Sequence, residues 1–165
     1  MFRCATERRR ALVRDADAAE GQRDLNGIDY LEVASADQRT LELVFLKPLP
    51  GEANGVPAAP VLTADNLVIE GGVRVTGIAV DAVSAAANVL TITVGEAGDF
   101  SGYTLRLVAG AGSSDAPDGF DPLLAEVVFS FKAGCPSEFD CAPVEVCPPE
   151  PLLEPDIDYL ARDYA

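Results

Sequence analysis

Residues 89–108 read VLTITVGEAGDFSGYTLRLV, two strand-like segments joined by a glycine-rich turn. Val89–Val94 is rich in valine, isoleucine and threonine, which favour a half-buried pleated surface. Tyr103–Val108 alternates apolar with polar side chains, the period-two pattern of a strand with one buried face. Gly98–Gly102 has the composition of a tight turn. This stretch predicts two consecutive antiparallel strands, and it sets the class of the fold.

The sequence on either side has the same strand character. No helix long enough for a parallel crossover lies between the predicted strands, which argues against a parallel α/β sheet. About seven short strands with regular turns are typical of an antiparallel β-sandwich of the immunoglobulin-like kind, in which two sheets cover one core. The further predicted strands are Ile28–Val33, Thr40–Leu46, Leu67–Glu70, Val73–Val83 and Val127–Lys132.

Changes in composition divide the chain into four regions. Residues 3–20 are rich in alanine, arginine and glutamate, which favour a helix, but their few apolar residues require an external surface to pack on. Prolines hold the segment after the sandwich extended. We expect an N-terminal arm or helix over 1–25, a mainly β domain over 26–134, a Cys/Pro-rich linker over 135–155, and over 156–165 the start of a helix leading into a body that this sequence lacks.

The charge balance limits the class of partner. The chain has 12 basic and 27 acidic residues and a formal net charge of −15. Such a surface disfavours nucleic acid, whose phosphates need lysine and arginine, and also an anionic membrane. No stretch approaches the roughly 18 apolar residues of a membrane span, and the N-terminus lacks the apolar segment of a secretory signal. We therefore expect synthesis in the cytoplasm and partners that are proteins.

The sequence offers little for catalysis. It contains no histidine, which excludes Ser-His-Asp and Cys-His catalysis and mixed Cys/His zinc sites. It also has no phosphate-binding or dinucleotide-binding glycine motif. The aspartates at 115, 118 and 121 have a spacing seen in calcium loops, but acidic residues are expected in any such turn. We assign no catalytic residue and expect that the chain is not an enzyme.

The four cysteines are the candidate metal ligands. Cys135, Cys141 and Cys147 are evenly spaced in the proline-rich segment, and Cys4 joins them if the chain ends meet. Four thiolates suffice for tetrahedral zinc or for an iron–sulfur cluster, which would act as a staple for the polar tail and not in catalysis. Two alternatives stay open: buried thiols that behave as small apolar groups, and disulfides formed after release from the cell.

Several motifs along the chain resemble a known family. RCATERRR at 3–10, GDFSGYTLRLV at 98–108, CPSEFDC at 135–141 and PDIDYLARDYA at 155–165 are similar to the N-terminus of baseplate assembly (baseplate J-like wedge) proteins of phage-tail-like contractile injection systems. The resemblance runs from residue 2 to residue 165. Family members continue from the last motif into a long body, so the resemblance covers the N-terminal β-domain and its tether.

The resemblance implies a structural function. Wedge proteins of this type assemble around the central spike and hub, link it to the sheath, and hold the baseplate together until contraction. The partners implied are other wedge subunits, the spike or hub, and sheath proteins. The chain would then be part of an assembled injection-system particle after its synthesis in the cytoplasm.

The polar ends of the chain supply candidate partner-binding residues. Arg8, Arg9 and Arg10 can bind a carboxylate surface through the forked hydrogen bonds of guanidinium groups. In the acidic tail, Asp156, Asp158 and Tyr159 are further candidates for a complementary partner surface. The alternative for both sets is a solvated surface without a partner.

Two other functions remain open at this point. One is a surface- or carbohydrate-binding β-sandwich module, against which the 7% aromatic content and the absence of tryptophan count. The other is a metal or redox element built on the four cysteines. A glycan array distinguishes the first from a baseplate subunit, and metal stoichiometry distinguishes the second.

Overall fold

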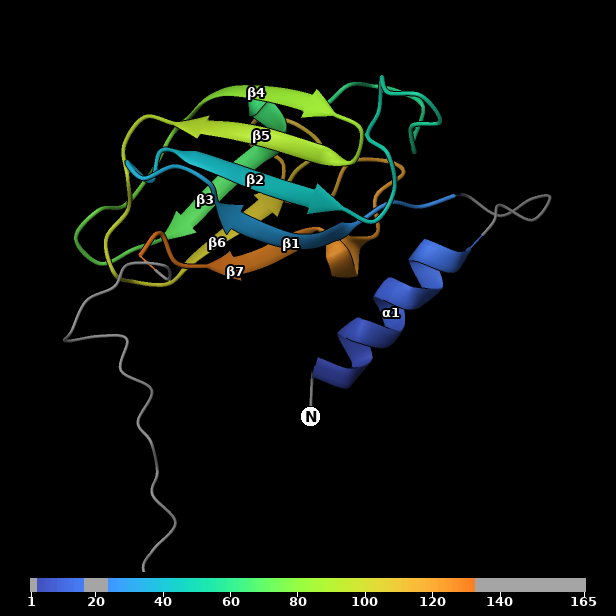
Figure 1. Cartoon of the computed structure of the whole chain (residues 1–165), viewed down its shortest axis with the longest axis horizontal. Helices are drawn as coiled ribbons and strands as arrows, with labels where there is room; N and C mark the ends of the chain where they lie inside the picture. Colours follow the sequence, from blue (N-terminus) through green and yellow to red (C-terminus); the bar gives the residue numbers. More distant parts are fainter. Residues whose placement is uncertain (1–2, 17–23, 133–165) are drawn as a thin grey trace, which may run out of the picture. The chain divides into compact units, whose positions relative to one another are not determined.

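The computed structural model describes residues 3–16 and 24–132 (Figure 1). The chain divides into two units, Met1–Gly134 and Cys135–Ala165. The second unit lies outside the described residues, and so do the predicted linker over 135–155 and the predicted helix start over 156–165. Among the described segments, no helix is long and apolar enough to span a bilayer.

The elements follow the predicted order of one helix and then strands. The secondary structure consists of α1 (Arg3–Asp15), β1 (Ile28–Val33), β2 (Thr40–Phe45), the 3₁₀ turn η1 (Ala64–Asn66), β3 (Leu67–Gly71), β4 (Val80–Ala86), β5 (Val89–Val94), β6 (Tyr103–Leu107), the 3₁₀ turn η2 (Pro122–Leu124) and β7 (Glu126–Phe129).

The seven strands form two antiparallel sheets, which Figure 1 shows as two layers. One sheet has the order β1-β2-β5-β4 and the other the order β3-β6-β7. Every second residue of β2, β5 and β6 is buried, which is the period-two pattern of one inward face per strand. The inward residues of both sheets belong to one core cluster, with Leu43, Leu90 and Leu105 fully buried. The predicted β-sandwich is confirmed.

Both edge strands of the larger sheet begin with a bulge at an aspartate. In β1, Ile28 pairs with Phe45 but Tyr30 pairs with Val44, so Asp29 is the extra residue. The same irregularity falls at Asp81 in β4. A bulge shifts the alternation by one residue and bends the strand. In β1 it turns Tyr30 to the exposed side, although the simple alternation from Ile28 predicts an inward side chain.

The strand predicted over Val73–Val83 is wrong in its first half. Strand β4 runs instead from Val80 to Ala86, and residues 72–79 form a loop. Gly71, Gly72 and Gly77 have φ values of 107°, 83° and 68°, which interrupt an extended strand. The apolar residues of this segment have a strand-like pattern, although their backbone forms a loop that folds back on the end of the sandwich.

Candidate interaction surfaces

Helix α1 is joined to the sandwich by an ion pair between Arg9 and Asp121. Arg9 Nε donates to Asp121 Oδ2 at 2.5 Å, and the Asp121 side chain is fully buried. Asp121 is also the N-cap of η2, where its Oδ1 accepts the backbone N–H of Leu123 at 2.9 Å. A buried carboxylate is costly unless a charge and hydrogen bonds compensate it. Arg9 supplies that charge from the helix.

A second acidic residue holds the same helix. Asp29, the bulged residue of β1, lies 3.2 Å from Arg14 Nη2 and 3.9 Å from Arg10 Nε, measured from its carboxylate oxygens. Arg10 and Arg14 lie four residues apart and therefore share one face of α1. The bulge points the Asp29 side chain toward α1, which regular pleating of the strand would not do.

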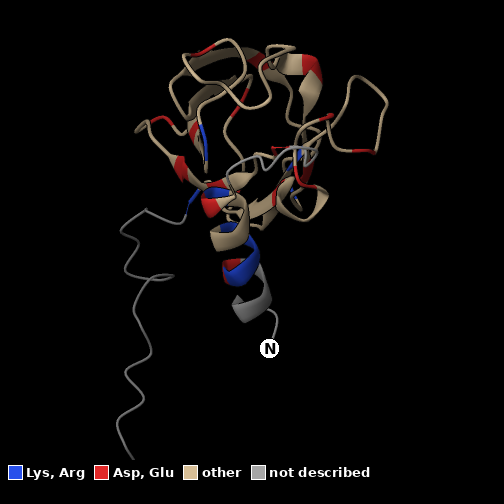
Figure 2. Ribbon diagram, turned by 90° about the vertical axis from the view of Figure 1, so that its right-hand side faces the viewer, with Lys and Arg blue, Asp and Glu red and all other residues tan. Residues whose placement is uncertain are grey.

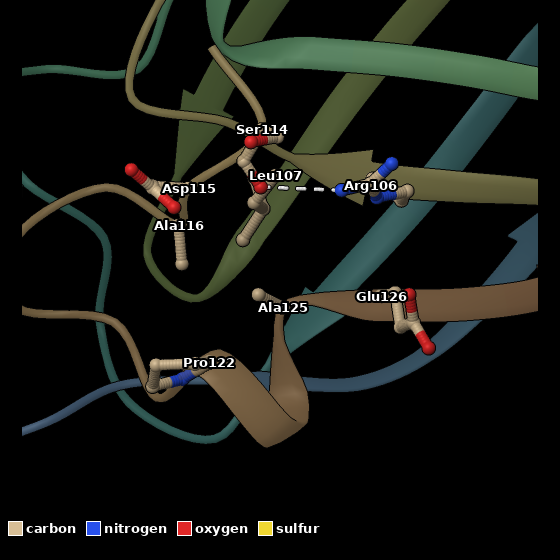
Figure 3. Close-up of a pocket in the computed structure, with 8 residues that line it drawn as sticks. All are labelled: Arg106, Leu107, Ser114, Asp115, Ala116, Pro122, Ala125 and Glu126. Carbon is tan, nitrogen blue, oxygen red and sulfur yellow. Dashed lines mark hydrogen bonds between the residues drawn. The ribbon is translucent and has the colours of Figure 1, made fainter.

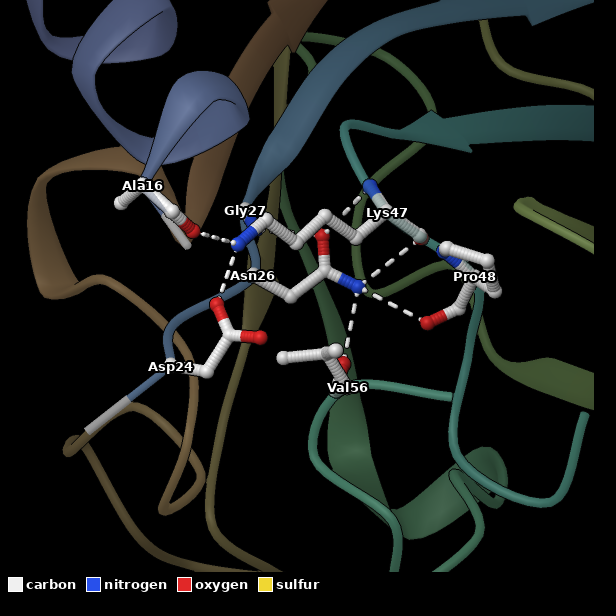
Figure 4. Close-up of polar contacts among 7 residues, drawn as sticks. All are labelled: Ala16, Asp24, Asn26, Gly27, Lys47, Pro48 and Val56. Atoms are coloured by element: carbon white, nitrogen blue, oxygen red, sulfur yellow. Dashed lines mark hydrogen bonds and ion pairs between the residues drawn. The ribbon is translucent and has the colours of Figure 1, made fainter. Parts of the chain in front are cut away.

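Below the helix, Asn26 joins three segments of the chain (Figure 4). Its side chain is fully buried. Nδ2 donates to the carbonyls of Lys47, Pro48 and Val56 at 3.0, 3.3 and 2.9 Å, and Oδ1 accepts the N–H groups of Gly27 and Lys47 at 2.9 and 3.0 Å. Its amide therefore gives hydrogen-bond partners to the backbone of two loops, and the Pro48 carbonyl also accepts the N–H of Val56 at 2.9 Å.

Lys47 extends this network to the end of α1. Its Nζ donates to the carbonyl of Ala16 at 2.8 Å and forms an ion pair with Asp24. Figure 4 shows the ammonium between these two groups. A cation at the C-terminal end of a helix is favourable, because the last carbonyls have no partners within the helix. The sandwich thus holds α1 near its C-terminal end through Lys47 and farther back through Asp29 and Asp121.

The opposite side of α1 faces solvent. Val13, four residues after Arg9, is buried, whereas Leu12 is 62% exposed. Arg8 is exposed on the same face as Leu12, since the two are also four residues apart. Figure 2 shows the basic residues along the helix. Leu12 and Arg8 form the outward surface of the arm.

The three predicted arm arginines differ in their contacts. Arg9 and Arg10 pair with Asp121 and Asp29 of the sandwich. Arg8 has no ion pair or hydrogen bond within the described parts of the chain. Binding of a partner by Arg8, Arg9 and Arg10 stays a prediction, and the geometry leaves Arg8 as the arginine with an unoccupied guanidinium.

The other predicted site residues lie outside the described residues. This applies to Asp156, Asp158 and Tyr159 of the tail and to Cys135, Cys141 and Cys147. Cys4 belongs to α1, but its side chain is not among those described. Over the described residues, no group of three potential metal ligands comes together. The zinc or iron–sulfur prediction therefore stays a prediction.

At one end of the sandwich, the carboxylate of Asp99 clamps two loops. Oδ2 accepts the N–H groups of Val73, Arg74 and Val75 at 3.3, 2.6 and 3.2 Å. Oδ1 accepts the N–H of Ser101 at 2.8 Å. Hydrogen bonds from the Ser101 side chain, and then from the N–H groups of Arg74 and Ser101, hold the pKa of the Asp99 carboxyl well below its ordinary value.

The buried Tyr103 completes this clamp. Its hydroxyl accepts the N–H of Asp99 at 2.9 Å and donates to the carbonyl of Val75 at 2.8 Å. Burial raises the pKa of the Tyr103 phenol. The ring packs edge-on against Phe131 with centroids 5.0 Å apart. The sequence predicts Gly98–Gly102 only as a tight turn and does not predict that this turn binds the loop after β3. The missed signal is Asp99, which directly follows Gly98 and lies two residues before Ser101, because an aspartate in a turn is suited to accepting backbone N–H groups.

A pocket of about 270 Å³ lies at the other end of the same sheet (Figure 3). Its lining includes Arg106, Ser114, Asp115 and Glu126. Arg106 is already engaged, because its guanidinium donates to the carbonyl of Ser114 at 3.2 Å and pairs with Glu70 at 3.3 Å. Asp115 and Glu126 have no side-chain partner within the described residues. The pocket therefore has two carboxylates and one guanidinium in its lining, and within the described residues the guanidinium pairs with Glu70 and not with these two carboxylates.

The chain matches a known family of proteins. The family described as phage baseplate assembly protein, N-terminal domain, matches residues 1–129. The matched range runs from α1 to the end of β7, and so it contains both the helix and the two sheets. Searches of the curated proteins and of the solved structures found no significant match.

Proposed function

The chain belongs to the family of phage baseplate assembly proteins, of which residues 1–129 form the N-terminal domain, and we propose that it acts in the baseplate wedge of a contractile injection system. Family membership supports a structural role in a phage-type baseplate and suggests a non-enzymatic one. More specifically, we propose that the chain links the spike or hub to the sheath and holds the baseplate together until contraction.

The observation that carries the proposal is the extent of the family match. The match covers both the arm and the sandwich, and three arginines of the arm pair with carboxylates of the sandwich. Helix and sheets are therefore presented to neighbours as one body. A small rigid domain with a polar arm suits a subunit that must hold its neighbours in a fixed arrangement.

As a baseplate protein, the chain interacts with other baseplate components and is part of an assembled particle. We propose other wedge subunits, the spike or hub, and sheath proteins as the specific partners. Arg8 on the outward face of α1 is the first residue to test at such a contact, followed by Asp156, Asp158 and Tyr159. A carboxylate surface on the partner would suit the arginine.

The test is particle assembly. Particles are purified from cells that carry either the intact gene or a gene lacking the segment for residues 1–134. We expect the chain in particles together with spike, sheath and tube proteins, and we expect loss of assembled, contractile particles on deletion. Unchanged contractile particles after the deletion would contradict an assembly role, and absence of the intact chain from particles would contradict the baseplate assignment in this system.

A further inference from the structure

Strand β4 is an edge strand with a long uncharged stretch. The sheet order β1-β2-β5-β4 places β4 at the margin of the larger sheet, with β5 as its one neighbour among the described strands (Figure 1). After the bulge at Asp81, β4 continues as AVSAA over Ala82–Ala86, without a charge or a proline. Edge strands of soluble proteins are normally short, charged, bulged or covered, because their unpaired backbone groups bind other strands. Over Ala82–Ala86, β4 has no charge, proline or bulge.

The pairing with β5 decides which backbone groups of β4 point outward. In β5, Val94 donates its N–H to the Arg39 carbonyl on the β2 side at 2.9 Å. Bonding direction alternates along a strand, so the even-numbered residues of β5 bond to β2 and its odd-numbered residues bond to β4. Ser84 pairs with residue 91, and therefore the N–H and carbonyl groups of Val83 and Ala85 point away from the sheet. Over the described residues, these four groups form no hydrogen bond.

The other three edge strands are less suited to accept a further strand. In β1, Glu32 lies within the strand and Asp29 holds α1. Strand β7 has only four residues and begins with Glu126. Strand β3 ends at Glu70 and Gly71, where the chain turns. A strand that adds to β4 meets a longer run of backbone with no charged side chain in it.

The two faces of β4 specify the side chains of an added strand. Val83 and Ala85 are partly buried and pack against the core, whereas Ala82, Ser84 and Ala86 are exposed on the opposite face. An added strand that carried apolar residues at alternate positions would extend the core beside Val83 and Ala85. The small side chains of the exposed face leave room for long polar residues on its other side.

The charge of this sheet indicates the charge of the partner. Its four strands contain no lysine or arginine and four acidic residues, Asp29, Glu32, Glu42 and Asp81. Asp81 is exposed at the beginning of the free edge and has no ion pair within the described residues. Arg39, which directly precedes β2, donates instead to the Val94 carbonyl. The net charge of −15 disfavours a second copy of the chain at this edge and favours a basic segment of another protein.

We propose that the free edge of β4 binds an extended, basic segment of another baseplate protein, which joins the sheet as a fifth strand. Its backbone bonds to Val83 and Ala85, its alternate apolar residues lie beside them on the inner face, and a lysine or arginine lies near Asp81. Backbone hydrogen bonds give such a contact its affinity, and the alternate side chains give it specificity. This inference names the chemistry of one partner contact and rests on the proposed function.

A proline at position 85 tests the contact in particles. Ala85→Pro removes an N–H that has no partner in the described domain, so circular dichroism should show a folded chain, while the ring blocks an added strand. We expect the amount of the chain in purified particles to fall by about tenfold or more. Val128→Pro is the matched control, because residue 128 also has an outward N–H, on the edge strand β7 of the other sheet. It should leave the amount unchanged.

A photo-crosslinker in place of Ser84 identifies the bound segment without depending on the proline variant. In particles it should capture a segment of a different protein, with alternating apolar residues and at least one lysine or arginine. The same segment, as a synthetic peptide added to the free full chain, should slow amide hydrogen exchange at Val83 and Ala85 by about tenfold or more and leave Val128 unchanged. Asp81→Lys should weaken this peptide, whereas Glu126→Lys in the other sheet should not.

The outcomes separate this contact from the baseplate role. If the wild-type chain is absent from particles, both the baseplate role and the contact are wrong. If the wild-type chain is present and Ala85→Pro enters particles equally well, the contact alone is wrong. Capture of a second copy at position 84, or a captured peptide that leaves the amides of Val83 and Ala85 unprotected, would likewise overturn the contact and leave the baseplate role standing.

Discussion

Arg9 and Asp121 are separated by 112 residues in the sequence, yet Arg9 Nε lies 2.5 Å from Asp121 Oδ2. The aspartate is buried and caps η2, while the arginine belongs to a helix that precedes all the strands. The pair makes the helix part of the sandwich. Because Arg9 is paired, the surface of α1 that is left for binding a neighbouring protein is the one formed by Arg8 and Leu12.

Replacing Arg9 by alanine should destabilise the domain. Asp121 would lose the charge that compensates its burial, and the free energy of unfolding should fall by about 1–3 kcal/mol, less than for a fully buried pair because Arg9 is partly exposed. Urea denaturation followed by circular dichroism measures this. Arg8→Ala on the same helix is the control and should change the stability by less than about 0.5 kcal/mol. Equal effects of the two variants would contradict the pairing.

Asn26→Ala should be among the most damaging single substitutions. It removes the hydrogen-bond partner of the Lys47 N–H and of the Lys47 and Val56 carbonyls, at a cost of about 3–5 kcal/mol, whereas the Pro48 carbonyl keeps its bond from the Val56 N–H. The midpoint of chemical denaturation reports the loss. Asn88→Ala removes one hydrogen bond of 3.0 Å to the Phe45 carbonyl and should cost only about 1 kcal/mol. If the two variants were equally stable, the role of Asn26 as a junction would be wrong.

Two glycines of the GDFSG turn make a matched pair. A Cβ at Gly98 would lie 2.3 Å from Phe131 Cδ2 and 2.7 Å from Tyr103 Cζ, whereas a Cβ at Gly102 would meet nothing within 4 Å. Gly98→Ala should therefore lower the stability by about 1–3 kcal/mol through overpacking. Gly102→Ala should be near neutral. Thermal unfolding of both variants checks the prediction, and a tolerated Gly98→Ala would show that the rings can move aside.

Asp99 makes stability depend on pH at the acidic end. Its pKa is lowered on folding from the ordinary value of 3.8, so its contribution is present above that value and is lost as the pH falls below it. The difference in stability between wild type and Asp99→Asn should stay constant from about pH 8 to pH 5 and shrink below about pH 4. Urea midpoints across this range measure it. A difference that grows on acidification would contradict the clamp.

The cysteine prediction is tested by metal content. We propose that Cys4, Cys135, Cys141 and Cys147 hold zinc or an iron–sulfur cluster, and protein purified without oxygen should then contain stoichiometric zinc or iron. Chelation should expose residues 135–165 to proteases and leave the sandwich core folded, because the core does not depend on the metal. Colourless, metal-free protein with four titratable thiols would end this proposal.

Much of the fold was predictable because strand formation depends on local patterns. The predicted strands Ile28–Val33 and Val89–Val94 have the observed bounds, since both are short segments of strand-favouring residues. The strand predicted over Val73–Val83 was wrong, because Gly71, Gly72 and Gly77 leave the extended conformation and Asp99 draws the loop back. An alternating hydrophobic pattern does not distinguish a strand that pairs with a neighbouring strand from a loop whose backbone N–H groups bind a side chain.

The amino-acid sequence by itself determined that this is a mainly β protein with a basic helical arm, because propensity and periodicity act between near neighbours. Only the tertiary structure decided what the polar residues do. Asn26, Asp99 and Asp121 look like ordinary turn residues, and each becomes a junction when closure of the sandwich brings distant backbone or charge to it. Burial and hydrogen-bond partners belong to the folded chain, and local sequence does not encode them.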